Sequence, residues 1–71
     1  MTKEQLHIVG NALWGFGWQS EMSRTLGVNE RTVRRWASGD HHVPDGLMNS
    51  LRPVIQDKVK SLQKLLKDKS L

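Results

Sequence analysis

The stretch QSEMSRTLGVNERTVRRWAS, residues 19–38, decides the fold because it contains two helix patterns separated by a short break. Apolar residues at every fourth position predict an amphipathic helix over residues 18–26. Gly27 then ends that helix in the left-handed conformation, which glycine adopts without strain. Asn29 is a favoured N-cap and starts a second predicted helix over residues 30–38, which Gly39 ends. The apolar stripe of the first helix consists of Trp18, Met22 and Leu26.

The short turn between these two helices constrains how they pack. Two helices joined by three residues including Gly27 must cross at a steep angle. Their contact needs a small residue, and Ser23 is there, although its hydroxyl must find a hydrogen-bond partner. The side chains expected to point inward are Met22, Leu26, Val28, Val33 and Trp36.

The second helix has an outer face of unusual composition. At about 100° per residue, its polar side chains fall opposite Val33 and Trp36. A helix that is apolar inside and arginine-rich outside, on a rigid two-helix unit, suits the major groove of DNA. The outer residues are Arg31, Arg34, Arg35 and Ser38, with Glu30 at the edge.

Helix signals continue on the N-terminal side. Residues 2–5, Thr-Lys-Glu-Gln, have the form of a capping box, which predicts a helix from about residue 3. Leu6, Val9 and Leu13 form one apolar stripe on it, and the glycines of residues 15–17 end it. Because no stretch alternates like a strand, the predicted fold is all-α, with four or five short helices.

The C-terminal part is predicted to be helical with an irregularity at Pro53. Proline either ends one helix at Arg52 and starts another, or kinks a single long helix. From Pro53 to Lys69 the apolar spacing is helical. We therefore expect two parts, a DNA-binding domain over residues 1–52 and a C-terminal helix over residues 53–71. Its apolar stripe is expected both to complete the core and to form a dimer interface. The interface residues expected are Ile55, Val59, Leu62 and Leu66.

Composition narrows the function. The chain has 71 residues, 11 Lys and Arg against 7 Asp and Glu, a net charge of +4 and no cysteine. Such a basic chain suggests a polyanionic partner, either nucleic acid or an acidic membrane surface. Three lysines opposite the C-terminal apolar stripe would permit a helix lying on a membrane, but flanking aromatic anchors are missing. A chain this short has a small core, so oligomerisation is the expected source of added stability.

Several other classes are not favoured. No stretch has the length of a membrane span or the pattern of a signal peptide. The neighbouring His41 and His42, with Asp40 and Asp45, do not predict a metal site, because adjacent loop side chains rarely point at one ion. No catalytic arrangement rises above chance. We therefore expect no enzyme, no cofactor, no metal and no small-molecule ligand.

The central stretch resembles the helix-turn-helix of the lambda-repressor-like (Cro-like, XRE) DNA-binding domains. The residues that carry this resemblance are Gln19, Ser23, Gly27, Val28, Val33 and Trp36. Residues 36–39 and Val43-Pro44 are also similar to that family, and the resemblance covers about residues 3–52. Ser23 departs from the family pattern, which usually has alanine there. The resemblance implies a helix-turn-helix over residues 19–38.

The resemblance also implies roles for individual residues. Contacts with base edges are expected from Glu30, Arg31, Thr32 and Arg35. Contacts with DNA phosphates are expected from Gln19, Arg34, Ser38 and His41, with bracing of the recognition helix a second role for Gln19. Arg31 and Arg35 suit bidentate contact with guanine, worth about 1–3 kcal/mol of discrimination each. Glu30 either accepts from a cytosine amine or complements the helix dipole in the first turn.

These observations predict a sequence-specific double-stranded DNA-binding protein that acts as a transcriptional repressor of phage or mobile-element type. A homodimer would place two recognition helices about 34 Å apart on an inverted-repeat operator. Similar small proteins often repress their own operon, including operons of anti-CRISPR type, in the cytoplasm of a bacterial host at the nucleoid. The alternatives are an antitoxin and an excisionase-type or architectural DNA binder.

Overall fold

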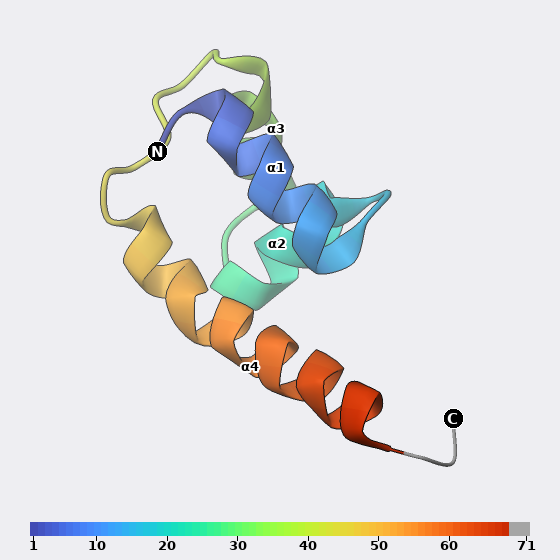
Figure 1. The fold of residues 1–71 in the computed structure, drawn as a ribbon. Coiled ribbons are helices and arrows are strands. Elements are labelled where there is room, and N and C mark those ends of the chain that lie inside the picture. The colour runs from blue at the N-terminus through green and yellow to red at the C-terminus, as the bar shows by residue number, and fades with distance from the viewer. Residues whose placement is uncertain (69–71) are drawn as a thin grey trace.

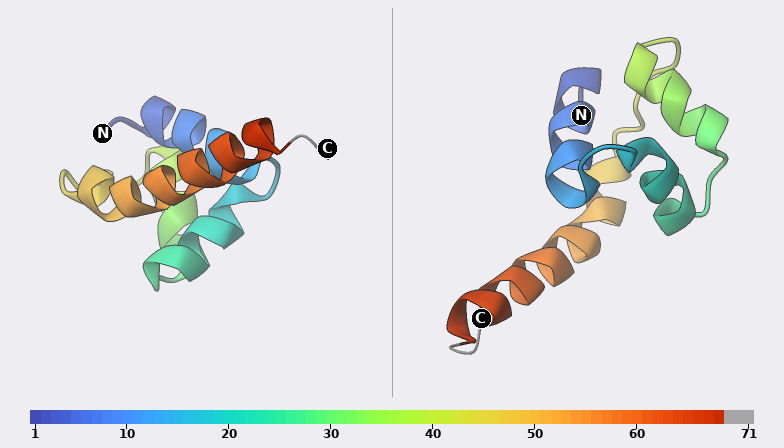
Figure 2. Two further views of the ribbon diagram at one scale, coloured as in Figure 1. Left: turned by 60° about the horizontal axis from the view of Figure 1, so that its bottom comes forward. Right: turned by 90° about the vertical axis from the view of Figure 1, so that its right-hand side faces the viewer.

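The computed structural model describes residues 1–68, and these form four helices without a strand. The helices are α1 (Lys3–Trp14), α2 (Trp18–Leu26), α3 (Glu30–Ser38) and α4 (Leu47–Lys67). The first three pack against one another, and α4 starts beside them and then runs outward (Figures 1 and 2), so the molecule is 46 Å long but only 22 and 21 Å across. The all-α prediction is confirmed. No helix within the described part has the length and apolar composition of a membrane span.

The ends of the first three helices follow from local sequence. The predicted capping box is present: the Gln5 N–H donates to Thr2 Oγ1 (3.1 Å), and the Thr2 N–H donates to Gln5 Oε1 (2.9 Å). Asn29 Oδ1 accepts from the backbone N–H of Arg31 (2.8 Å), so Asn29 is the N-cap of α3 as predicted. Gly27 ends α2 with a φ of +70°, a left-handed conformation that a side chain would strain.

One apolar core joins the helices, and it contains Trp18 and Trp36 as the stripes predict. Ser23 is also buried, and its hydroxyl donates to the Ser20 carbonyl (2.7 Å), which supplies the partner it needs. The expectation that Val28 points inward is wrong: it is 37% exposed because it lies in the turn rather than on a helix face. The core residues are Leu6, Trp18, Met22, Val33, Trp36, Ala37, Val43, Leu47 and Leu51.

Helix α1 lies very close to α2 and is fastened to α3. A Cβ atom at Gly10 would lie 2.2 Å from the indole of Trp18, so the α1 backbone rests directly on that ring. The rings of His7 and Trp18 pack in a T-shaped arrangement, with their centroids 5.2 Å apart and their planes at 73°. The Nε2 of His7 donates to the carbonyl of Ala37 near the end of α3 (2.9 Å). These contacts make α1, α2 and α3 one unit.

Helix α4 is continuous through Pro53, so of the two alternatives the end at Arg52 is excluded and a single long helix is found. Proline leaves the Asn49 carbonyl without its helical N–H partner, but Asn49 is exposed and water can satisfy that carbonyl. The predicted boundary between residues 52 and 53 falls inside α4. The helix ends at Lys67, and the predicted extension to Lys69 reaches beyond the described residues.

Candidate nucleic-acid interface

The outer side of α3 carries three exposed arginines, which we call the arginine face: Arg31, Arg34 and Arg35. The opposite side of the helix is buried, with Val33 fully inaccessible and Trp36 8% exposed. No ion pair between described residues engages any of the three guanidinium groups. The fold thus holds the apolar side of α3 in the core and leaves its cationic side available to an anionic partner.

The C-terminal end of α3 is held by its own polar groups. The Ser38 hydroxyl donates to the Arg35 carbonyl (3.1 Å) and accepts from the Asp40 N–H (3.4 Å). The backbone N–H of His41 also donates to the Arg35 carbonyl (3.2 Å), which folds the following loop back over the end of α3. The exposed side chains of His41 and Ser38, both predicted phosphate contacts, therefore lie at the same end of the arginine face.

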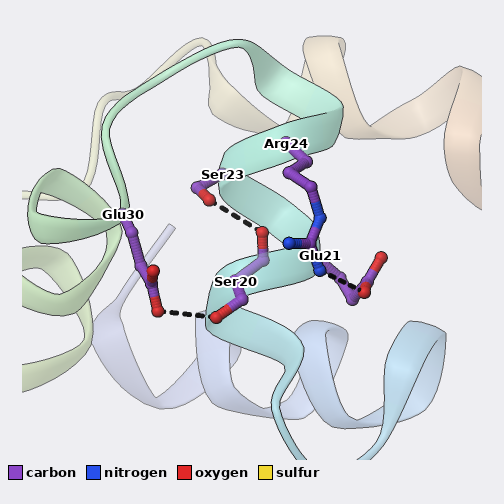
Figure 3. Close-up of polar contacts among 5 residues, drawn as sticks. All are labelled: Ser20, Glu21, Ser23, Arg24 and Glu30. Atoms are coloured by element: carbon purple, nitrogen blue, oxygen red, sulfur yellow. Dashed lines mark hydrogen bonds and ion pairs between the residues drawn. The ribbon is translucent and has the colours of Figure 1, made fainter.

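The N-terminal end of α3 is linked to α2 by a contact that the sequence did not indicate. The Ser20 hydroxyl donates to Glu30 Oε1 (2.6 Å), as Figure 3 shows. The carboxylate of Glu30 therefore links the start of α3 to α2 at the surface, a role outside the two that the sequence suggested for it. Figure 3 also shows Glu21 paired with Arg24 on α2 itself, away from this link.

A shallow hollow lies beside this link and brings two predicted phosphate contacts together. Gln19 from the first turn of α2 and Arg34 from α3 both line it. The N-cap of α2, Gly17, has no side chain to bond the first backbone N–H groups of that helix. Phe16, fully exposed in the preceding turn, forms part of the same hollow.

Thr32, a predicted base contact, lies half-buried on the flank of α3.

Lys3 of α1 places a further positive charge beside the C-terminal end of α3. Lys3 Nζ would lie 3.3 Å from a Cβ at Gly39, the residue that ends α3. Lys3 also lines a hollow together with His41 and His42. No sequence pattern indicates this cluster, because Lys3 is far from α3 along the chain and only the packing of α1 brings it there.

The predicted dimer residues lie on a different part of the molecule. Ile55 is partly buried against the core, whereas Val59, Leu62 and Leu66 are 45%, 51% and 87% exposed. The C-terminal half of α4 therefore does not complete the core, in contrast to one of its two expected roles. Figure 2 (right) shows this half running away from α3, so it stands apart from the arginine face.

Replacing Asn29 by alanine is expected to lower the free energy of unfolding by about 1 kcal/mol, the usual contribution of an N-cap side chain. The loss arises because the Arg31 N–H at the start of α3 would lose its 2.8 Å partner. Urea denaturation followed by circular dichroism measures it. Asn49→Ala on the exposed side of α4 is the control, and equal losses in both variants would contradict a capping role for Asn29.

Comparisons of the chain with protein-family models, with curated proteins and with solved structures give no match. Within the described residues, no group of three or more His, Asp or Glu side chains is placed to hold a metal ion. Support for a function therefore comes from the side chains of the arginine face and from the packing that holds them.

Proposed function

We propose that the protein binds double-stranded DNA sequence-specifically, with α2, the turn at Gly27 and α3 acting as a helix-turn-helix. The observation that carries the proposal is the polarity of α3, whose apolar side is buried while the other side has three arginines that form no ion pair with any residue of the described part. A helix of this kind fits the major groove, where guanidinium groups recognise guanine and phosphates through bidentate hydrogen bonds. The chain resembles the lambda-repressor-like domains in this same segment.

Arg31 and Arg35 are the proposed base-reading residues. They lie one turn apart on α3, about 6 Å along the helix axis, so the two guanidinium groups reach neighbouring base pairs. Arg34 lies beside Arg31 and Arg35 on α3 and lines the same hollow as Gln19. This position suits Arg34 and Gln19 for phosphate contacts. Ser38, His41 and Lys3 would contact phosphates at the other end of α3. Such contacts fix the position of the helix, whereas the base contacts supply the specificity.

The proposed biological role is transcriptional repression by a homodimer that covers its operator. In a two-fold symmetric dimer the two α3 helices enter successive major grooves on one side of the DNA. A bound dimer excludes RNA polymerase without a separate effector domain. The proposed setting is control of its own operon in a phage or another mobile element, inside a bacterial cell.

Selection of bound duplexes from a random-sequence library tests the function directly. We expect an inverted repeat whose half-site centres lie about 10 base pairs apart, or a multiple of that distance. Affinity for the selected duplex is expected to fall steeply as salt rises, because phosphate contacts release counterions. Equal binding of all duplexes, with strong bending, would instead indicate an architectural protein, and absence of binding would refute the proposal.

A further inference from the structure

An apolar groove runs between α1 and the C-terminal half of α4, on a side of the molecule that the proposed DNA contacts do not use. Its walls include Ile8, Val9 and Ala12 from α1 and Ile55, Val59 and Leu62 from α4. Ile8 is 68% exposed although it lies in the middle of a well-packed helix. Ile8 and Ala12 lie outside the apolar stripe that faces the core, which contains Leu6 and Leu13, so helical periodicity does not indicate them.

The apolar surface of α4 continues beyond the groove as a ridge. Leu65 and Leu66 lie on the part of α4 that extends past the other helices and are 53% and 87% exposed. Of the seven large hydrophobic residues exposed within the described chain, five lie on the groove or the ridge. An apolar surface this concentrated on a small polar protein indicates an interface.

We propose that the occupant of the groove is the free end of α4 from a second copy of the chain. The inference rests on the homodimer of the proposed function and adds the surface that forms it. A two-fold axis near Val59 and Leu62 would run the two α4 helices antiparallel and bring the partner's Leu66 beside Ile55 and Ile8. The ridge of each copy would then fill the groove of the other, as a self-complementary two-fold interface requires.

The distribution of charge on α4 supports a second copy. Lys60, Lys64 and Lys67 lie opposite the apolar side at helical spacing, so they remain in solvent when two copies join. Lys58 is the charged residue among those lining the groove. Its four-carbon stem can lie along the apolar wall while its ammonium group reaches water at the rim. Pairing of two basic chains on this side therefore brings few like charges together.

The available area also matches a small dimer. Complete burial of one large aliphatic side chain removes roughly 100 Å² of apolar surface from water. At their present exposures, the five residues of groove and ridge would together bury on the order of 300 Å² per copy. Since about 60% of an interface is apolar, two copies would bury about 1,000 Å² in total. This area reaches the lower limit for a specific complex.

Sedimentation velocity at tens of micromolar protein, without DNA, measures the proposed dimer. The wild-type chain is expected to be a dimer. Ile8→Glu and Leu62→Glu are each expected to weaken association by about a hundredfold or more, because each places two carboxylates in an apolar contact. Phe16→Glu is the matched control: it makes the same charge change at an exposed hydrophobic residue outside the groove and is expected to remain dimeric.

Disulfide cross-linking tests the arrangement of the two chains, because the natural chain contains no cysteine. Ile8→Cys and Leu66→Cys are prepared as separate proteins with different tags, mixed and oxidised. The proposed geometry predicts a cross-linked heterodimer in the mixture, whereas Phe16→Cys mixed with Leu66→Cys is expected to give none. Circular dichroism of each variant confirms that its helices are intact.

Three results would overturn the inference. These are a monomeric wild-type chain, an Ile8→Glu variant that dimerises as tightly as the wild type, and cross-linking no stronger at position 8 than at position 16. The sedimentation measurement contains no DNA, so failure of this interface and failure of DNA binding are observed separately. If only Leu62→Glu weakens the dimer, α4 forms the interface without α1, and the proposed groove between the two helices is not the dimer surface.

Discussion

Replacing Gly10 by alanine is expected to lower the free energy of unfolding by about 2–3 kcal/mol. In an exposed helix the same change would stabilise by about 1 kcal/mol, because alanine has the better helix propensity. Here the added methyl group would lie 2.2 Å from the ring of Trp18, which is itself buried in the core and only 5% exposed. Either α1 must lift from α2 or the indole must leave its rotamer, and overpacking of this kind is costly.

Thermal and urea denaturation followed by circular dichroism measure this effect, with a fall of about 10–20 °C expected in the melting temperature. Gly46→Ala is the matched control. Gly46 is the N-cap of α4, has a negative φ and has no atom within 4 Å of the position of its Cβ, so its replacement is expected to cost less than about 1 kcal/mol. If Gly10→Ala proves as stable as Gly46→Ala, the close approach of α1 to Trp18 is wrong.

Arg31→Ala and Arg35→Ala are each expected to weaken binding to the selected operator by about 10- to 100-fold, the usual value of a bidentate contact with guanine. Each variant is also expected to lose its preference at one base pair of the half-site. The fold should not change, because both side chains are exposed and make no ion pair with described residues. Fluorescence anisotropy with a panel of singly substituted operators measures both effects.

Arg24→Ala supplies the control for charge. It removes the same positive charge, but Arg24 lies on α2 and is paired with Glu21, so only a small, sequence-independent loss of affinity is expected. If Arg31→Ala and Arg35→Ala keep the base preferences of the wild type, these arginines do not read bases. An equal loss of affinity in all three variants would indicate general electrostatic attraction instead.

Local signals in the sequence were sufficient for the first three helices and their ends. The capping box at Thr2, the N-cap at Asn29 and the left-handed Gly27 depend on neighbouring residues, and each occurs where the pattern predicts it. The periodicity of Val33 and Trp36 likewise identifies the buried side of α3 and therefore its exposed arginines. The all-α fold and the composition of the arginine face follow from such short-range rules.

Contacts between residues that are far apart in the sequence could not be predicted from such short-range rules. The link from Ser20 to Glu30 and the position of Lys3 beside Gly39 depend on how the helices cross, which periodicity does not encode. Val28 was misjudged because a turn residue has no helical face. The sequence left open whether Pro53 ends a helix, because the cost of a proline depends on whether the carbonyl that it leaves unpaired is exposed to water.

His7 and Ile8 are neighbours in sequence, and their side chains leave α1 about 100° apart around its axis. His7 bonds to the end of α3, and Ile8 is a wall of the proposed dimer groove. In the proposed dimer, α3, the proposed recognition helix, would thus be joined to the interface through a single turn of α1, without a linker. The separation of the two half-sites would then be a fixed property of the protein, so inserting or deleting one base pair at the operator centre would put the second half-site out of phase.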